Sequence, residues 1–223
     1  MKNDISCEII KEMFDKLAQK YDFLNNIISL YTHKLFKKQA IKTLDFCENC
    51  KVLDLCCGSA DVSKIVKKIN PKAQIIGVDF SSKMLEIAKN KIKNVEFIEA
   101  NASELPFSND EFDIIICAFG FRNIIEKSKA LSEIKRVLKT NGQFLHIDFE
   151  GKSKFSLIYD IAILILLQFF IKDKSPYKYL INSKKHFYTT NELIEMFEKI
   201  NLKCVLKKRK FFNIVSFQKM IKK

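Results

Sequence analysis

Asp54, Gly58 and Asp79 are residues whose types and spacing suggest the binding of a small ligand. Asp54 opens the stretch DLCCGSAD, and Asp79 lies near the end of the apolar stretch AQIIGVDF. In an open sheet of parallel strands, ligands bind beyond the carboxyl ends of the strands. A carboxylate that ends the second strand, about 25 residues after Asp54, is placed to accept hydrogen bonds from ribose hydroxyls. These residues therefore favour a nucleoside ligand.

The loop after Asp54 contains few glycines, which narrows the class of nucleoside. A dinucleotide fingerprint requires GxGxxG, and a phosphate loop requires a lysine followed by serine or threonine. Only Gly58 is present here. The loop suits a nucleoside without phosphate, such as S-adenosylmethionine, whose ammonium group Asp54 or Asp61 is available to hold. The structural alternative is that Asp54 and Asp79 only cap helices or stabilise turns.

Two later pairs of residues also follow stretches that are typical of strands. Asn101 offers an amide to the edge of an adenine, and Ala102 leaves room for its ring. Arg122 and Asn123 belong to the stretch FGFRN, which follows the apolar stretch FDIIICA. A charge and an amide would then face the predicted ligand pocket.

The elements that position these residues alternate along the chain. Strands are predicted over 51–57, 73–80, 95–100, 112–119 and 142–150, with Asn141-Gly142 turning into the last of them. Helices are predicted over 8–20, 33–46, 59–69, 81–91 and 126–138. The first helix places Ile9, Met13 and Leu17 on one face. Strands that alternate with helices of this length are typical of βαβ units and a parallel sheet.

After residue 150 the pattern changes. The apolar stretch 157–171 contains Asp160 and Gln168 and is too short to span a bilayer, so we expect a buried or interfacial helix. A capped helix is predicted over 189–200, and a β-hairpin over 202–221. Residues 1–223 are therefore expected to form a single α/β domain with a seven-stranded, mostly parallel sheet, helices on both faces and a C-terminal antiparallel hairpin. Its expected parts are an N-terminal helical cover (1–46), a cofactor-binding core (51–150), a helical insert (151–188) and a closing segment (189–223).

The charge and the cysteines limit the classes of partner. The net charge is +13, of which residues 152–223 carry +11. This basic third suits nucleic acid or an anionic membrane, although a generally lysine-rich composition also accounts for it. The odd number of cysteines, without a leader-like N-terminus, favours reduced thiols. Cys47 and Cys50 form a CxxC with no histidine nearby, so we predict no metal site, and we expect Cys56 and Cys117 to be small core residues.

Several motifs make the sequence similar to a known family. They are MFDKLAQKYDFLNNIISL (13–30), THKLFKK (32–38), VLDLCCGSAD (52–61), VDFSSKML (78–85), EANASELPFSNDEFD (99–113), AFGFRNI (118–124), KALSEIKRVLKTNGQFLHIDF (129–149) and YKYLINSKKHF (177–187). On these motifs the chain resembles the ubiquinone/menaquinone-biosynthesis C-methyltransferases, which have the Rossmann-like class I methyltransferase fold and use S-adenosylmethionine. The resemblance runs almost from end to end.

The resemblance implies cofactor contacts at specific positions. They are Ser59, Asp79, Asn101, Ala102 and Ala118. Asp79 and Asn101 agree with the interpretation from strand ends, whereas Ser59 and Ala118 rest on the resemblance alone. The family usually has glycine at Ala60, Pro-Gly at Thr140-Asn141 and proline at Tyr188, so these three places depart from its pattern.

The reaction that the resemblance implies is methylation of a ring carbon in a polyprenylated quinol, in menaquinone, phylloquinone or ubiquinone biosynthesis. Arg122 would stabilise developing phenolate charge, and Asn123 would orient a hydroxyl or a water. The alternative for Arg122 is an ion pair with an acid such as Asp22. His186 is a weaker candidate for the base.

The N-terminal segment and the prenyl tail have their own expected positions. Tyr21, Asp22 and Asn25 are expected to close over the cofactor. Residues 157–171 and Phe187 are expected to line a channel for the tail. The basic third would touch an anionic membrane peripherally, on the cytoplasmic face of the inner membrane or in a plastid stroma.

Other functions remain open at this stage. A non-catalytic cofactor-binding subunit of a quinone-synthesis assembly would also bind S-adenosylmethionine. The charge favours an RNA methyltransferase, but no RNA-binding module is evident, so we predict no nucleic-acid partner. A nicotinamide oxidoreductase lacks support because the phosphate loop is missing. The ring type, the tail length and the formation of a homodimer are left open.

Overall fold

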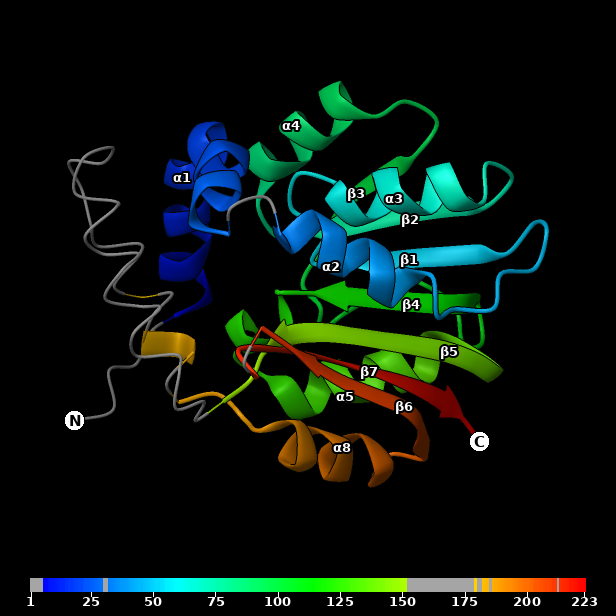
Figure 1. Cartoon of the computed structure of the whole chain (residues 1–223). Coiled ribbons are helices and arrows are strands. Elements are labelled where there is room, and N and C mark those ends of the chain that lie inside the picture. The colour runs from blue at the N-terminus through cyan, green and yellow to red at the C-terminus, as the bar shows by residue number, and fades with distance from the viewer. Residues whose placement is uncertain (1–5, 30–31, 152–178, 180–181, 185, 212) are drawn as a thin grey trace.

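The computed structural model describes residues 6–29, 32–151, 179, 182–184, 186–211 and 213–223. In this part of the chain a seven-stranded sheet has the order β3-β2-β1-β4-β5-β7-β6 (Figure 1). The strands are β1 (Lys51–Leu55), β2 (Gln74–Asp79), β3 (Glu96–Glu99), β4 (Phe112–Ala118), β5 (Leu138–Phe149), β6 (Leu202–Lys210) and β7 (Val215–Lys222). β1 to β5 pair in parallel, while β7 pairs antiparallel with both β5 and β6. The predicted mostly parallel sheet with a C-terminal hairpin is confirmed.

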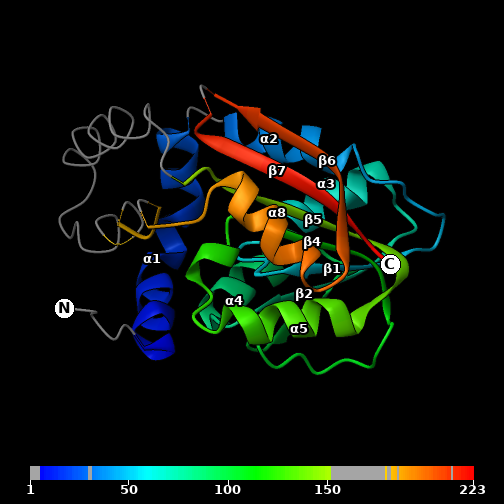
Figure 2. The same ribbon diagram turned by 90° about the horizontal axis from the view of Figure 1, so that it is seen from below.

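Helices lie on both faces of the sheet and across one end of it. They are α1 (Cys7–Ile28), α2 (Thr32–Ile41), α3 (Asp61–Ile69), α4 (Ser82–Lys91), the 3₁₀ helix η1 (Phe121–Asn123), α5 (Lys127–Val137) and α8 (Thr190–Glu198). α2 and α3 pack on one face, and α5 and α8 on the other (Figure 2). α1 stands across the end to which β4 and β5 point, so it covers the carboxyl ends of the parallel strands (Figure 1).

The sequence explains why the central strands are buried on both sides. β1 and β4 are apolar runs, and Leu53, Ile115 and Cys117 are fully buried in the core that α5 and α8 cover. Parallel strands covered by helices on both faces have this composition. Side-chain caps fix where two helices begin. The Ser81 hydroxyl accepts a hydrogen bond from the Met84 amide, and Thr189 forms a capping box with Glu192.

α1 differs from its prediction in length and in its buried face. It continues to Ile28, eight residues past the predicted end, because no glycine or proline interrupts it. Ile10, Phe14 and Leu17 are buried, whereas Ile9 is 56% exposed. Apolar side chains are adjacent at 9–10 and 13–14, so two faces were available. The helix turns the one with Phe14 inward, where its ring packs edge-on at 6.0 Å from that of Phe80.

β5 also begins earlier than predicted. Its pairing with β4 shifts register between the partners Leu138 and Gln143, so Asn141 and Gly142 lie in an irregular part of the strand and not before it. Asn141 has φ 62°. Asparagine tolerates this left-handed conformation, which is why it can stand where a glycine is usual.

Strained backbone gathers where β1 and β4 end. Cys56, Gly58, Ala60 and Phe119 all have positive φ, between 52° and 64°. A left-handed conformation costs about 1–2 kcal/mol for residues other than glycine. Such strain is common at ligand sites. It marks the end of the sheet that α1 covers.

Part of the predicted C-terminal third cannot be compared with the structure. The stretch 157–171, and with it most of the predicted insert 151–188, lies outside the described residues. Among the helices that are described, none combines the length and the hydrophobicity that a bilayer span requires.

Candidate functional site

A cavity of about 320 Å³ lies at the carboxyl ends of β1, β2 and β4, under α1. Its described lining residues are Ser6, Cys7, Phe14, Tyr21, Leu55, Cys56, Gly58, Val78, Asp79, Phe80, Met84, Ala100, Asn101, Ala102, Ser103, Ala118, Phe119, Gly120, Asn123, Ile124, Ile125 and Glu126. The strand order reverses between β1 and β4, which is where ligands bind in sheets of this type. Its volume suits a small molecule. We call it the first cavity.

Asp79 is the buried acid of the first cavity. Its Oδ2 accepts a hydrogen bond of 2.8 Å from the Gly58 amide, and its Oδ1 accepts one of 3.0 Å from the Ser81 amide. Burial raises the pKa of Asp79 to about 6, although these backbone hydrogen bonds favour the charged form. Each carboxylate oxygen can accept a further hydrogen bond, so a ligand hydroxyl can be bound here.

Small residues and the amide of Asn101 form part of the wall of the first cavity. Gly58 has φ +52°, and a Cβ added to it would lie 4.0 Å from Cε1 of Tyr21. Ala102 and Ala118 line the cavity, and so does Asn101, whose Oδ1 accepts a hydrogen bond of 3.1 Å from the Ser103 amide. The Asn101 amide nitrogen lies 4.0 Å from Cys7 Sγ, a weak acceptor that a ligand can replace.

Asn123 brings an unsatisfied acceptor to the same cavity. It ends η1 and lines the first cavity, and its Oδ1 is buried without a hydrogen-bond partner. An unpaired buried oxygen costs free energy unless a ligand or water donates to it. Asp79 and Asn123 therefore provide acceptors on two sides of the cavity.

Three predicted contacts do not line this cavity. Asp54 is 1% exposed, and its Oδ2 accepts hydrogen bonds from the amide and the hydroxyl of Ser63, at 2.9 and 2.6 Å. Burial raises its pKa to about 7. In the described structure Asp54 therefore caps the start of α3, as the structural alternative expected. The Ser59 hydroxyl donates to Asp22 at 2.5 Å. Asp61 pairs with His33 and Lys91. Neither Asp54 nor Asp61 is therefore placed to hold the ammonium of a ligand in the first cavity.

A second cavity, of about 290 Å³, adjoins the first. Its described lining residues are Tyr21, Asn25, Ser29, Thr32, His33, Phe36, Lys37, Phe119, Arg122, Phe149, Phe211, Ile214 and Val215. Tyr21 and Phe119 line both cavities. The wall of the second cavity combines aromatic and aliphatic side chains with polar ones. The cavity therefore suits an apolar ring or chain that carries hydroxyl groups.

Arg122 lines the second cavity, although its neighbour Asn123 lines the first. Its Nη1 donates to Asp148 Oδ1 at 2.7 Å and to the Phe119 carbonyl at 2.7 Å. The Arg122 side chain is 6% exposed and that of Asp148 0%. Arg122 thus forms an ion pair, but its partner is Asp148 and not Asp22. Arg122 Nε is buried without a partner, so the guanidinium is not fully satisfied by the protein.

His33 was not singled out by the sequence analysis, yet its side chain contacts two polar side chains beside the second cavity. Its Nδ1 lies 2.5 Å from Ser29 Oγ, and its Nε2 lies 3.5 Å from Asp61 Oδ2. Burial lowers the pKa of His33, while the hydrogen bond with Asp61 opposes this and the charge of Lys37 adds to it. The motif THKLFKK contained this residue, but its partners come from two other helices.

Of the three residues expected to close over the cofactor, only Tyr21 lines the first cavity. Tyr21 lines both cavities and Asn25 lines the second. Asp22 connects the cover to the core, because its Oδ2 lies 2.6 Å from Lys91 Nζ, and the same ammonium lies 2.6 Å from Asp61 Oδ1. α1 is thus attached to α3 and α4 by charged side chains.

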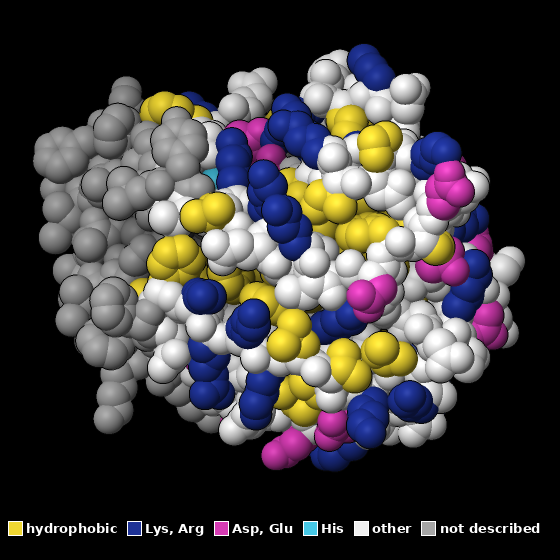
Figure 3. Space-filling view, turned by 45° about the vertical axis from the view of Figure 1, so that its right-hand side comes forward, with side chains coloured by type: hydrophobic (Ala, Val, Ile, Leu, Met, Phe, Trp, Pro, Cys, Tyr) yellow, Lys and Arg dark blue, Asp and Glu magenta, His cyan; other side chains and the backbone are white. Residues whose placement is uncertain are grey.

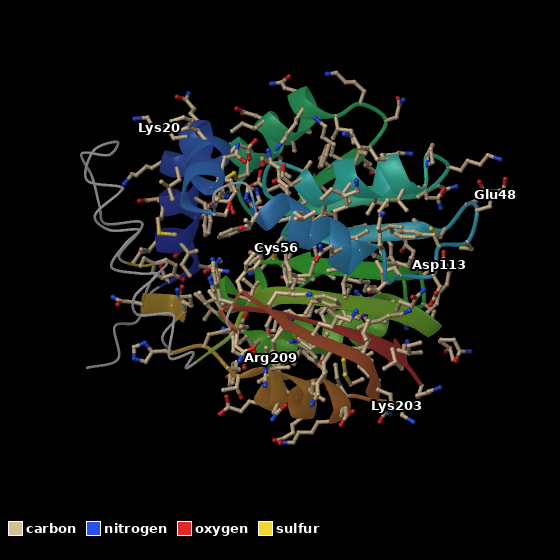
Figure 4. The ribbon with its side chains drawn as sticks, viewed as in Figure 1. Lys20, Glu48, Cys56, Asp113, Lys203 and Arg209 are labelled. Atoms are coloured by element: carbon tan, nitrogen blue, oxygen red, sulfur yellow. The ribbon has the colours of Figure 1, made fainter. Side chains whose placement is uncertain are left out.

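Other expectations of the sequence are corrected. Phe187 is 4% exposed and packs in the core against Phe121, so it lines neither cavity. His186 is exposed and bonds the Asn182 carbonyl at 3.0 Å, away from both cavities. Cys117 is a core residue as expected, but Cys56 lines the first cavity, at the strand ends beside α1 (Figure 4). Within the described residues, no group of three or more metal-ligating side chains gathers.

The two cavities together can hold two different ligands at one shared wall. The first offers acceptors for hydroxyl and amino groups, and the second offers an apolar space beside a guanidinium and an imidazole. Such an arrangement positions two reactants for a direct transfer of a group between them.

Known proteins resemble this chain over most of its length. The model of the ubiE/COQ5 methyltransferase family matches residues 2–222. A demethylmenaquinone methyltransferase of Staphylococcus carnosus is 33% identical over 214 residues, which cover 92% of this chain and 89% of that protein. A protein of the same name from Staphylococcus aureus is 34% identical over 206 residues, with 88% and 86% covered.

Solved structures share the fold at lower identity. A SAM-dependent methyltransferase from Thermotoga maritima has a TM-score of 0.69 and 21% identity, and the similarity covers 95% of this chain and 99% of that one. A SAM-dependent methyltransferase from Aquifex aeolicus has a TM-score of 0.61 and 20% identity, with 83% and 88% covered. The fold is that of the class I methyltransferases.

Proposed function

Because the chain belongs to the ubiE/COQ5 methyltransferase family, we propose that it methylates a ring carbon of a polyprenylated quinol, with demethylmenaquinol as the acceptor. The family and the fold make the protein an S-adenosylmethionine-dependent methyltransferase. The choice of acceptor is supported by the names of relatives that are 33% and 34% identical over most of each chain. The runner-up acceptor is a benzoquinol precursor of ubiquinone.

The observation that carries this proposal is the wall that the two cavities share. A methyl group can pass directly between two ligands only if their reacting atoms meet. Tyr21 and Phe119 line both cavities, so a ligand in each would meet between these two rings. The apolar lining of the second cavity, with Phe36 and Phe149, fits a quinol ring and the start of a prenyl tail.

The residues of the first cavity fit S-adenosylmethionine. Asp79 would accept hydrogen bonds from the ribose hydroxyls, and Gly58 leaves space beside it. Asn101 would bind the adenine edge, with Ala102 and Ala118 against the ring. The unpaired Oδ1 of Asn123 would accept a hydrogen bond from the ligand or from an ordered water. S-adenosylmethionine, when bound, supplies an electrophilic methyl group on its sulfonium.

The protein positions the acceptor and balances the charge that develops on it. The ring carbon would form the bond to the methyl group while the sulfur keeps the electron pair of the broken bond, and the proton that this ring carbon then loses would restore the quinol hydroxyl, so that one proton is released overall. Loss of the hydroxyl proton makes the ring a stronger nucleophile. Arg122 would stabilise the resulting oxygen charge, because its guanidinium lines the second cavity and retains an unpaired donor.

We also propose that the substrate arrives from an anionic membrane. The exposed strand β6 carries Lys203, Lys207, Lys208, Arg209 and Lys210 and no acidic residue. Exposed Val205 lies within it, and exposed Phe211 follows it and also lines the second cavity. On the face in Figure 3, basic side chains are widely spread, with hydrophobic side chains between them. Such a surface supports peripheral attachment beside the entrance for a prenyl tail.

The test of the proposed reaction is complementation followed by lipid analysis. The chain is expressed in a bacterium that lacks its quinone C-methyltransferase, and the extracted quinones are measured by mass spectrometry. Restored menaquinone or ubiquinone would establish the reaction and the ring accepted. Persistent demethyl forms, with a folded protein that binds S-adenosylmethionine, would contradict it and favour the non-catalytic subunit. A folded Arg122→Ala variant with wild-type turnover would remove Arg122 from the mechanism.

A further inference from the structure

The second cavity contains a candidate for the group that receives the hydroxyl proton. Its ionisable lining side chains, among the described residues, are Tyr21, His33, Lys37 and Arg122. A protonated lysine or arginine has no acceptor atom. Burial raises the pKa of Tyr21, which keeps its own proton in place. His33 is therefore the acceptor that the described wall offers.

The imidazole of His33 is held on both sides by side chains from outside α2. Its Nδ1 lies 2.5 Å from the hydroxyl of Ser29, which follows α1, and its Nε2 lies 3.5 Å from Oδ2 of Asp61, the first residue of α3. Ser29 Oγ also lies 2.6 Å from the Asn25 carbonyl. Ser29 and His33 both line the second cavity.

This arrangement is satisfied in two protonation states. A hydroxyl has a single proton to donate. When Ser29 donates to Nδ1, the imidazole is neutral and donates its Nε2 proton to Asp61. When Nδ1 carries a proton, it donates to Ser29 Oγ, and the Ser29 hydroxyl turns to the Asn25 carbonyl. His33 can thus gain a proton while all heavy atoms stay where they are.

The charges around His33 favour a neutral ring that is ready to accept. The charged groups that act on it directly are Lys34 and Lys37 on α2 and Asp61 on α3. Lys91 on α4 and Asp22 on α1 are connected to it through Asp61, and Arg122 on η1 lines the same cavity. Burial opposes the charge of Asp61, but the hydrogen bond from His33 and the charges of Lys37 and Lys91 outweigh it and hold its pKa well below the usual range. Burial lowers the pKa of His33, with Lys37 adding to the effect.

We infer that Ser29, His33 and Asp61 form the proton relay of this enzyme. The ring hydroxyl gives its proton to Ser29 Oγ, Ser29 passes its own proton to His33 Nδ1, and the Asp61 carboxylate stabilises the imidazolium. The ring oxygen keeps the electron pair of its O–H bond. After the product leaves, His33 returns the proton to water. The inference rests on the proposed function, because it requires a quinol hydroxyl in the second cavity.

A purely structural role for the same contacts makes a different prediction. The three side chains also join α1, α2 and α3, so their loss would loosen the N-terminal cover. Loosening would weaken substrate binding at every pH. A proton relay instead determines how turnover depends on pH, because only the neutral imidazole accepts.

The experiment measures kcat between pH 5 and 9 for the full chain, with S-adenosylmethionine and a reduced short-chain demethylmenaquinol. We expect wild-type kcat to fall toward tenfold per pH unit below the pKa of His33. In His33→Gln, kcat should be at least about 100-fold lower at neutral pH, and the decline in acid should vanish. S-adenosylmethionine affinity, measured by calorimetry, should stay within about threefold because His33 does not line the first cavity. His186→Gln is the matched control and should keep the wild-type profile.

Each result decides between relay and scaffold. A folded His33→Gln protein with the wild-type kcat and acid decline would overturn the relay. If that variant fails to fold, Ser29→Ala is measured instead, and its kcat should fall about tenfold or more with the acid decline retained. A folded Ser29→Ala protein within twofold of wild type would then overturn the relay. Wild-type protein that methylates no quinol would overturn the proposed function, and the relay with it.

Discussion

At the scale of single residues, the two cavities differ in the kind of charge they contain. The first holds a buried carboxylate, Asp79, and the second holds Arg122, already paired with Asp148. Burial raises the pKa of a carboxyl group because the charged form loses its contact with water. Hydrogen bonds from a ligand stabilise that charged form. In the second cavity, the charge of Arg122 is already balanced by that of Asp148. The ligand of the first cavity should therefore change the protonation of Asp79.

Binding of S-adenosylmethionine should depend on pH through Asp79. Burial raises the pKa of this carboxyl to about 6, so the empty site holds a proton below that pH. Ribose hydroxyls bind the charged form, so ligand binding expels the proton in acid. We expect the affinity to fall as pH drops below 6, by up to about tenfold per unit, and to be constant above pH 7. Calorimetric titrations between pH 5 and 8 measure this.

The Asp79→Asn variant identifies the titrating group. It should bind S-adenosylmethionine about tenfold more weakly at neutral pH, because a hydrogen bond to a charged group is lost. Its affinity should no longer change between pH 5 and 7. A variant that retained the wild-type pH dependence would show that another carboxyl titrates, with Asp54 as the first alternative because burial raises its pKa to about 7.

At the scale of elements, the site depends on how α1 is fixed across the strand ends. Lys91 on α4 holds it, with Asp22 Oδ2 and Asp61 Oδ1 each 2.6 Å from its ammonium. The Lys91 side chain is 19% exposed, so water screens these contacts only in part. Ser59 joins the same group, because its hydroxyl lies 3.2 Å from Lys91 Nζ. Ser59 thus supports the cover in the described structure.

Lys91→Met should loosen the cover and leave the sheet intact. It keeps an apolar stem but removes the charge between two carboxylates, so the free energy of unfolding should fall by about 1–3 kcal/mol. Hydrogen exchange should become faster in α1 and stay slow in β1 and β4. Lys89→Met, an exposed lysine on the same helix, is the control and should change neither quantity. Equal protection of α1 in both variants would show that Lys91 does not hold this helix.

Residues at strand ends could be predicted from the sequence, whereas contacts between helices could not. Asp79 and Asn101 end parallel strands, and the carboxyl ends of such strands meet at one edge of the sheet. His33, Ser29 and Asp61 come from three helical segments whose relative placement depends on packing. The partner of Arg122 was also mistaken, because Asp148 faces it only through the pairing of β4 with β5. The φ of 64° at Ala60 explains why the family usually has glycine there. An alanine in the sequence does not reveal this left-handed conformation.

At the scale of the whole molecule, the positive charge is distributed unevenly along the chain. Residues 152–223 carry +11 of the net charge of +13. β6 contributes an edge strand whose basic side chains are exposed, and the strand ends near Phe211 at the second cavity. Lysines on an edge strand also discourage pairing with another sheet. Attraction to anionic lipid is a second explanation for the basic side chains of β6, and it can be tested separately.

The protein should bind vesicles that contain anionic lipid, and β6 should carry much of that binding. Each basic residue near such a surface contributes about 1 kcal/mol, so reversing Lys207, Lys208 and Lys210 to Glu should weaken binding at least about 100-fold. The control reverses Lys42, Lys68 and Lys72, which changes the net charge equally at the far ends of α2 and α3. Sedimentation with phosphatidylserine vesicles at low and moderate salt compares the three proteins. Equal losses in both triple variants would mean that net charge alone attracts the protein, and a wild-type protein that stays unbound at moderate salt would remove the membrane from the proposal.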